Sequence, residues 1–315
     1  MSKPTIENPK INGPKSDPLD LIDQAANIHN NTSFDVVHKD FGAFLEKFVV
    51  FPCSQPPLKP LSGLTFAVSD SIDVKNHISG FGSPSWKATH KPAKKMAVIV
   101  ADLLKRGATC VGKTVSGELG FGIAGENAYN VTLDNPQFPE IVHGGSSSGS
   151  SVAVASGIVD FALGIDTVGD IRIPASFCGV IGFRPSHGAI STIGVIPNSG
   201  SLDCVGFLAR NPSVLQRLAH PLMQVNPVAP EIPRQLIFAE DLFELCEVTK
   251  DKIKSIIAKA ITERSGYKSP ISVNIIHHIA SNVPSLRIFY GKDVNVQDER
   301  AILATLSFVM VSLQR

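Results

Sequence analysis

The sequence predicts an α/β domain in which a mixed β-sheet is flanked by α-helices. Strand and helix signals alternate along the chain, the pattern expected when helices cover the faces of a sheet. The 315 residues are 43% hydrophobic and 18% charged, enough to bury a large core in one or two domains. The net charge of +1 offers no basic face for nucleic acid and no acidic excess that would indicate disorder.

The N-terminal part of the chain has two different characters. Residues 1–38 are polar, contain four prolines and lack a long apolar run, which predicts a mostly disordered segment with a short helix near 18–29. Residues 39–50 predict a short amphipathic helix, because Phe44 and Phe48 fall on one helical face. The proline-rich segment 52–60 is a connector.

The remaining elements alternate between apolar runs typical of buried strands and longer helical patterns. Gly107, for example, marks the end of the first of these helices. The predicted strands are 64–68, 109–111, 161–165, 180–183, 235–238 and 272–276. The predicted helices are 96–104, 150–156, 212–223, 250–264 and 298–313.

Two linked segments carry the signal for function. Residues 143–151 read His-Gly-Gly-Ser-Ser-Ser-Gly-Ser-Ser, and residues 164–176 read Gly-Ile-Asp-Thr-Val-Gly-Asp-Ile-Arg-Ile-Pro-Ala-Ser. A phosphate-binding Walker loop would need a lysine after its last glycine, where Ser150 stands. A flexible linker would not lead into the apolar run 152–155.

The spacing of these segments resembles the core of the amidase signature family, serine hydrolases that cut amide bonds with a serine nucleophile, a second serine on a cis peptide and a lysine. The resemblance implies that Asp170 stands at the nucleophile position and Ser69 at the lysine position. Ser146, 24 residues before position 170, stands at the position of the cis serine. The loop that would bind the oxyanion corresponds to Thr167, Val168 and Gly169, with Val168 in place of the usual glycine.

Two of the three catalytic side chains of that family are therefore replaced. A serine hydroxyl at position 69 cannot act as a base near neutral pH. A carboxylate at position 170 would form an anhydride on attack and would oppose the oxyanion. We therefore expect Ser69 and Asp170 to disfavour enzymatic activity, and the alternative is a hydrolase of a small amide such as indole-3-acetamide.

A finer resemblance covers most of the chain after residue 38. The segments 40–44, 110–114, 163–167 and 183–188 are similar to plant amidase-like import receptors of the mitochondrial and chloroplast outer membranes. This implies a catalytically degenerate module that binds protein partners through its amidase-like surface. Those receptors carry a membrane anchor and chaperone-binding helical repeats, and neither is seen here. We expect residues 39–315 to form an incomplete, truncated domain that is cytoplasmic as given.

No cofactor or metal is predicted. The five cysteines are widely spaced and form no C-x-x-C pair. His277 and His278 have no carboxylate partner in the sequence nearby, and Asp70 and Asp73 are interpreted as local structure. The apolar run 301–313 is too short to span a membrane.

Overall fold

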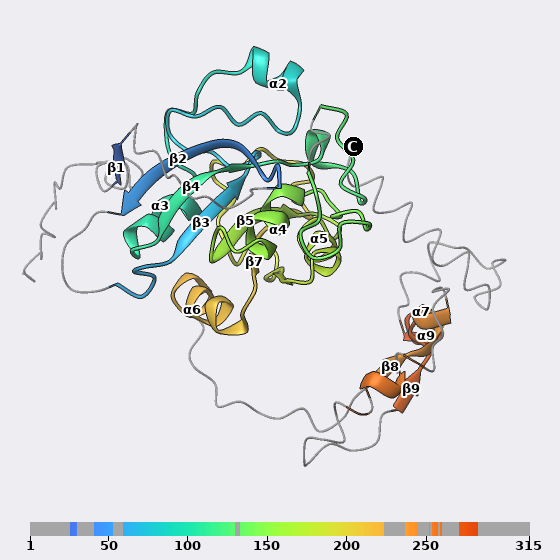
Figure 1. Cartoon of the computed structure of the whole chain (residues 1–315). Helices are drawn as coiled ribbons and strands as arrows, with labels where there is room; N and C mark the ends of the chain where they lie inside the picture. The colour runs from blue at the N-terminus through green and yellow to red at the C-terminus, as the bar shows by residue number, and fades with distance from the viewer. Residues whose placement is uncertain are drawn as a thin grey trace, which may run out of the picture. The chain divides into compact units, whose positions relative to one another are not determined.

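The computed structural model describes part of the chain in two compact units, residues 1–226 and 227–315. The described residues are 26–29, 41–52, 59–129, 133–223, 237–244, 252, 254–257, 259 and 271–282. Figure 1 shows the elements of both units. The predicted domain limits at 38 and 39 fall outside the described residues and stay predictions.

A mixed seven-stranded sheet organises the first unit. The strand order is β1-β2-β4-β3-β5-β7-β6, with β3 parallel to both β4 and β5 and the other pairs antiparallel. The strands are β1 (Ala26–His29), β2 (Phe44–Pro52), β3 (Thr65–Ser69), β4 (Thr109–Thr114), β5 (Phe161–Asp166), β6 (Ile181–Phe183) and β7 (Cys204–Ala209). The predicted α/β class with a mixed sheet is confirmed.

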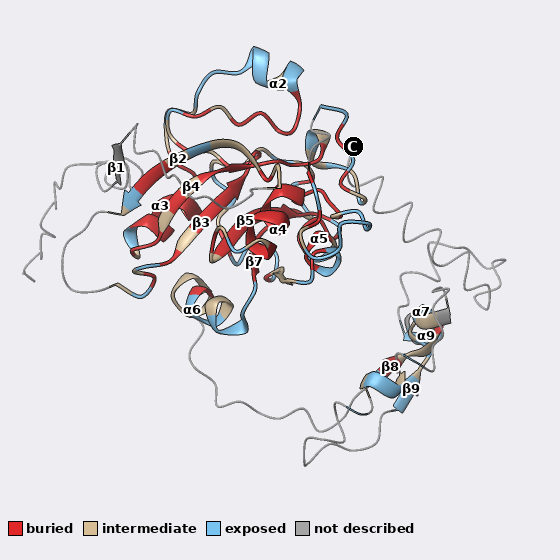
Figure 2. Ribbon diagram, viewed as in Figure 1, coloured by how far each residue is buried: buried red, intermediate tan, exposed pale blue. Residues whose placement is uncertain are grey.

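Helices pack on both faces of this sheet because the side chains of its strands alternate between two apolar cores. Phe66 points to the core that includes α3, whereas Ala67 points to the core that includes α4. The helices of this unit are α2 (Pro84–Thr89), α3 (Val98–Lys105), the 3-10 turn η1 (Glu118–Gly120), α4 (Ser148–Ala155), α5 (Arg172–Phe177) and α6 (Pro212–Met223). In Figure 2 the buried residues follow β5, β7 and α4 through the middle of the unit.

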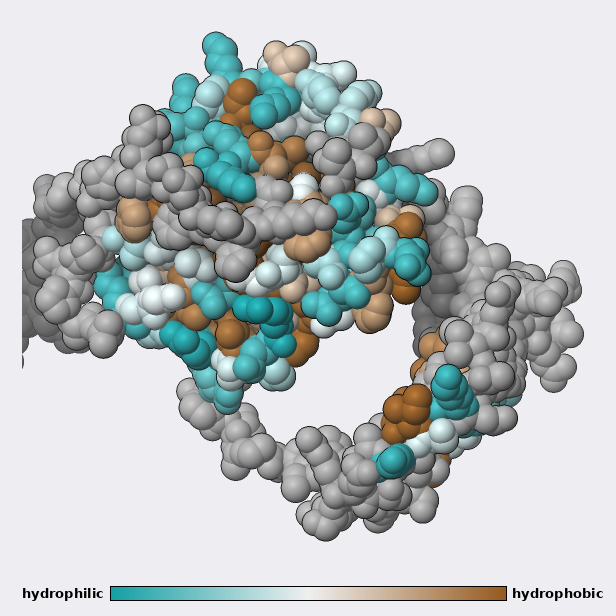
Figure 3. Space-filling model, in the orientation of Figure 1, coloured by the Kyte–Doolittle hydropathy of each residue, from teal (hydrophilic) through white to brown (hydrophobic). Residues whose placement is uncertain are grey.

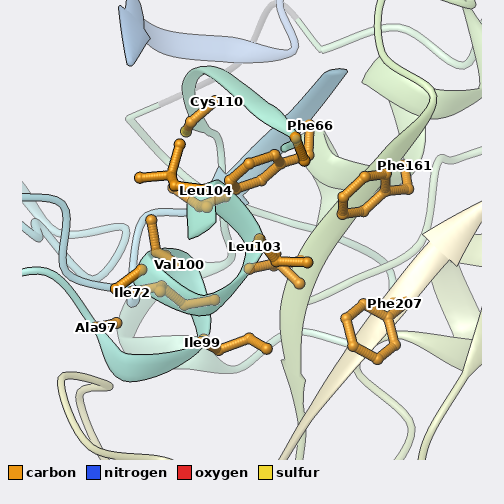
Figure 4. Close-up of a cluster of buried hydrophobic side chains, with 14 of the residues drawn as sticks. Phe66, Ile72, Ala97, Ile99, Val100, Leu103, Leu104, Cys110, Phe161 and Phe207 are labelled. Atoms are coloured by element: carbon orange, nitrogen blue, oxygen red, sulfur yellow. The ribbon is translucent and has the colours of Figure 1, made fainter. Parts of the chain in front are cut away.

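The larger core is built on three phenylalanines from neighbouring strands. Phe66 of β3 stacks on Phe161 of β5 with ring centroids 5.3 Å apart, and Phe207 of β7 lies in the same cluster. Leu103 of α3 packs beside them (Figure 4). Full burial of each such side chain contributes about 2–3 kcal/mol to folding, so this cluster fixes α3 on its face of the sheet.

Helix α4 runs through the second core with all eight of its residues buried. Gly149 in this helix donates its N–H to the carbonyl oxygen of Val115 at 2.9 Å. A Cβ at position 149 would lie 2.4 Å from the carbonyl oxygen of Ala43 and 2.5 Å from the nitrogen of Val115. Glycine is therefore required for α4 to approach the backbone this closely.

The predicted amphipathic helix at 39–50 is wrong, because residues 44–52 form strand β2. Phe44 pairs with Thr114 of β4, and Val50 pairs with Cys110. The four-residue spacing of the aromatic side chains fits a helix locally, but pairing with β4 and β1 satisfies the backbone in an extended form. Ala26–His29, the end of the short helix predicted near 18–29, is strand β1, and 18–25 lie outside the described residues.

The second unit contains a small parallel sheet. Strands β8 (Ile237–Ala239) and β9 (Ile271–Val273) pair, and helices α7 (Glu240–Glu244) and α9 (Ile275–Asn282) follow them. The predicted strand at 272–276 ends at Val273, because Asp241 accepts the N–H of Ile275 at 3.1 Å where α9 begins. Residues 254–257 are helical as predicted within 250–264, whereas the helix predicted at 298–313 lies outside the described residues.

Candidate active site

The candidate site lies where the parallel strands β3 and β5 end. Carboxyl ends of parallel strands meet at one edge of a sheet, which is where ligands bind in most α/β folds. Ser69 is the last residue of β3, and the loop 167–170 follows β5. The loop before α4 supplies Ser146, whose peptide bond with Gly145 is cis.

The structure brings Ser146 and Asp170 into direct contact. The Oγ of Ser146 donates to the Oδ1 of Asp170 at 3.1 Å, and both residues are buried. The N–H of Ser147 also donates to the backbone oxygen of Asp170 at 3.0 Å. The loop before α4 and the loop after β5 are thus joined at two points.

The carboxylate of Asp170 also turns back onto its own loop. Its Oδ2 accepts the backbone N–H groups of Thr167 at 2.9 Å and Val168 at 3.0 Å. The third N–H of this loop, that of Gly169, donates to Oδ1 of Asp166 at 3.0 Å. All three N–H groups that the sequence resemblance assigned to an oxyanion loop therefore have acceptors within the protein.

Asp166 fixes the shape of this loop from its buried side. It is fully buried, and Arg172 donates to it from Nε at 3.0 Å and from Nη2 at 2.9 Å, while Arg184 donates from Nη1 at 3.0 Å. Burial raises the pKa of Asp166, but hydrogen bonds and charge from Arg172 and Arg184 outweigh it, so the pKa lies below its ordinary value. The ionised carboxylate thus organises residues 166–172.

Ser69 faces other hydroxyl groups. It is 2% exposed, and its Oγ lies 3.4 Å from the Oγ of Ser71. The neighbouring Asp70 accepts the N–H groups of Gly80 and Gly82, each at 3.1 Å, which is the local structural role expected for it. Among the described residues, the hydrogen-bond partner of the Ser69 hydroxyl is another hydroxyl and not a base.

A buried lysine, Lys113, lies nearby but serves the adjoining loop. It is 1% exposed, and its Nζ donates to the Oγ of Ser79 at 2.8 Å and to the carbonyl oxygen of Ile78 at 3.2 Å. Burial lowers its pKa, and the charge of Asp70, 3.7 Å away, opposes this only in part. Sequence reasoning missed this role, because its partners lie more than 30 residues away along the chain.

The space between these side chains is small. About 10 Å³ is open to the centre of a water molecule, which is room for about one water. Ser116, buried on one wall, has an Oγ with no hydrogen-bond partner among the described residues. Neither lysine nor histidine is among the lining residues that the structure describes. These are Ser69, Ser71, Phe81, Ser116, Gly120, Ser146, Ser147, Ile165, Thr167 and Asn198.

Comparison with known proteins identifies the family of this fold. The family model named Amidase matches residues 47–235, more than half of the chain. The chain belongs to the amidase family. A crystal structure described as an amidase has a TM-score of 0.65 at 26% identity, and the match covers 87% of this chain and 69% of that amidase.

Two curated relatives show the range of proteins that share this amidase region. Outer envelope protein 64, mitochondrial, from Arabidopsis thaliana is 52% identical over 283 residues, covering 88% of this chain and 47% of the relative. Amidase 1 from the same plant is 44% identical over 283 residues, covering 88% of this chain and 67% of the relative. The chain thus spans about half the length of the outer envelope relative. In the described residues, every helix is too short or too polar to cross a bilayer.

Proposed function

We propose that this chain is a non-hydrolytic amidase module that acts by binding, as part of an organellar outer-membrane import receptor. The observation that carries the proposal is the hydrogen bonding of Asp170. Its carboxylate accepts hydrogen bonds from the N–H groups of Thr167 and Val168 and from the hydroxyl of Ser146. The similarity to outer envelope protein 64, mitochondrial, supports the receptor part of the proposal.

Amide hydrolysis by a serine mechanism needs a base, a nucleophile and donors for the oxyanion. The hydroxyl of Ser69 lies beside the hydroxyl of Ser71, and it does not remove a proton at neutral pH. Asp170 replaces the nucleophile, and its negative charge occupies the place where the oxyanion would develop. The three requirements therefore fail together at one site.

The size of the cavity supports the same proposal. Small-molecule sites usually enclose about 300–1,000 Å³. The space at Ser146 admits the centre of about one water molecule in the described part of the chain. An aromatic amide does not fit there without movement of the surrounding loops.

The location of this module is also a proposal. The name of the outer envelope relative places that relative at an organellar outer membrane. We propose that the chain as given is cytoplasmic. Fractionation of plant cells that produce the tagged chain tests this location, and recovery in sealed organelles would contradict it.

Steady-state hydrolysis of indole-3-acetamide and of aryl amides tests the absence of catalysis. The unmodified chain should give no turnover above that of Ser146→Ala. Restoring both Ser69→Lys and Asp170→Ser should be necessary for activity, and either change alone should recover little, because such groups act as a unit. Turnover by the unmodified chain that disappears in Ser146→Ala would overturn the proposal.

The alternative function is hydrolysis of a small amide such as indole-3-acetamide. It is favoured by the retained Ser146 and by the 44% identity to Amidase 1. The same assay separates the two functions, since only the hydrolase produces turnover that depends on Ser146.

A further inference from the structure

Exposed apolar side chains gather on the loops around the candidate site. Nine of the eleven exposed large hydrophobic residues described in the first unit lie in two loop segments, 119–129 and 138–142, or are Val168 and Phe177. We call this set the loop surface. It consists of Leu119, Phe121, Ile123, Tyr129, Phe138, Ile141, Val142, Val168 and Phe177. Scattered surface hydrophobics are ordinary, but a concentration of this kind marks an interaction site.

The two segments meet at the glycine pair that precedes Ser146. The N–H of Gly145 donates to the carbonyl oxygen of Ile123 at 2.8 Å. On the other side, the ring of Phe177 lies so close to Gly144 that a Cβ there would be 3.1 Å from its Cδ2. Ile123 and Phe177 therefore lie on either side of the glycine pair. Figure 3 shows hydrophobic side chains exposed beside hydrophilic ones along the side of the first unit that carries α5.

Two buried asparagines hold these segments in shape. Asn127 donates to the carbonyl oxygens of Gly82 and Ser116, each at 2.9 Å, and accepts the N–H of Tyr129 at 2.9 Å. Asn135 donates to the carbonyl oxygen of Phe177 at 2.9 Å and accepts the N–H of Phe138 at 3.1 Å. The loops are thus tied to the core while their apolar side chains face outward. A surface fixed in this way loses little conformational entropy when it binds a partner.

The exposed charges on the loop segments themselves have one sign, whereas the exposed Lys87 and Arg172 lie outside those segments. Residues 114–171 contain neither lysine nor arginine. Within them Glu126, Asp134 and Glu140 are exposed. Arg172, which ends this stretch, donates both Nε and Nη2 to Asp166. The exposed charged side chains described between residues 114 and 171 are therefore all acidic, and we call these three carboxylates the acidic rim.

This charge selects among the possible occupants. An anionic lipid surface would be repelled by the acidic rim. A second copy of the chain, docking symmetrically, would bring two acidic rims together. A helix with an apolar face flanked by lysine or arginine would match both the apolar centre and the rim. We propose that the loop surface docks a basic amphipathic helix of a partner polypeptide.

Binding of a model peptide to the 315-residue chain tests this docking site. The probe is a fluorescent peptide of about 18 residues with leucine and lysine at helical spacing, and the control peptide replaces each lysine with glutamate. Fluorescence anisotropy should show saturable binding of the lysine peptide, at least about tenfold tighter than that of the glutamate peptide. Equal binding of the two peptides would overturn the proposal.

A matched pair of isoleucines locates the binding site. Ile123 on the loop surface is 61% exposed, and Ile193 outside it is 60% exposed. Ile123→Ser should weaken binding about tenfold, whereas Ile193→Ser should change it less than about twofold. Equal losses from both changes would contradict the proposed site. Both substitutions are at exposed positions, and unchanged thermal unfolding verifies that each variant is folded.

The acidic rim is tested separately. The double substitution of Glu126→Gln and Glu140→Gln should weaken peptide binding about threefold at low salt, and the difference should vanish near 0.5 M salt because charges are screened. Sedimentation of the chain alone tests for a dimer. Flotation with vesicles of anionic phospholipid tests for binding to a membrane. A dimer broken by Ile123→Ser, or vesicle binding lost in that variant, would refute the proposal. Peptide binding and amide hydrolysis are separate measurements, so the docking site stands or falls independently of the proposed loss of catalysis.

Discussion

Shortening Asp170 to alanine tests whether its carboxylate holds the loop together. The change removes the acceptor of two backbone N–H groups, those of Thr167 and Val168, and the partner of the Ser146 hydroxyl. Each buried polar group left without a partner costs about 1–3 kcal/mol. Val168 is 38% exposed, so water replaces part of this loss. We therefore expect Asp170→Ala to lower the free energy of unfolding by about 2–4 kcal/mol.

Asp170→Asn should cost much less. Its amide oxygen can accept both N–H groups, and its NH₂ can donate to Ser146, so about 1 kcal/mol or less should be lost. The measurement is urea unfolding followed by circular dichroism. Asp102→Ala is the control, since Asp102 forms a partly exposed ion pair with Arg106 at 3.0 Å, worth about 1 kcal/mol at most. If Asp170→Ala is no less stable than this control, or if Asp170→Asn loses as much as Asp170→Ala, the carboxylate does not hold the loop.

Two further predictions concern the core. Gly149→Ala should lower the free energy of unfolding by about 3 kcal/mol or more, because the added Cβ would meet two backbone atoms. Gly200→Ala, where no atom lies within 4 Å of the added Cβ, should be nearly neutral, and equal effects in thermal unfolding would contradict the close approach of α4. Because burial holds the pKa of Lys113 below its ordinary 10.5, the unfolded chain binds more protons than the folded chain at pH values between the lowered pKa and 10.5. The stability of the wild type relative to Lys113→Met should therefore increase as the pH rises toward 10.5 in urea titrations, and a constant difference would show that Lys113 is not desolvated.

The sequence could predict strands β3 and β5, but it predicted neither strand β2 nor the interior strand β7. The apolar runs at 64–68 and 161–165 are long enough to identify β3 and β5 without their partners. In β2, Phe44 and Phe48 are spaced as on a helix, and only pairing with β4, about 60 residues later along the chain, decides for the extended form. Such long-range pairing leaves no mark in a local pattern.

The candidate site shows a similar division. The sequence identifies which residues stand at positions 69, 146 and 170, and it predicts that a charge at 170 opposes an oxyanion. It could not reveal that the carboxylate of Asp170 is bound by the N–H groups of its own loop, because this depends on the rotamer and on the backbone after β5. The burial of Lys113 was missed for a related reason, since its hydrogen-bond partners come from a distant loop.

The hydrogen bonds of Asp170 also bear on how such a protein could change in evolution. A mutation that removes the carboxylate first would weaken the fold before any nucleophile could act. A lysine introduced first at position 69 would place an amine beside a water-sized space, with no serine at position 170 to activate. Neither substitution alone would be favoured by selection for hydrolysis. Loss of the Asp170 carboxylate would also be opposed by selection for stability. Under the proposed function, a return to hydrolysis would therefore need both substitutions, one of which lowers stability when it occurs alone.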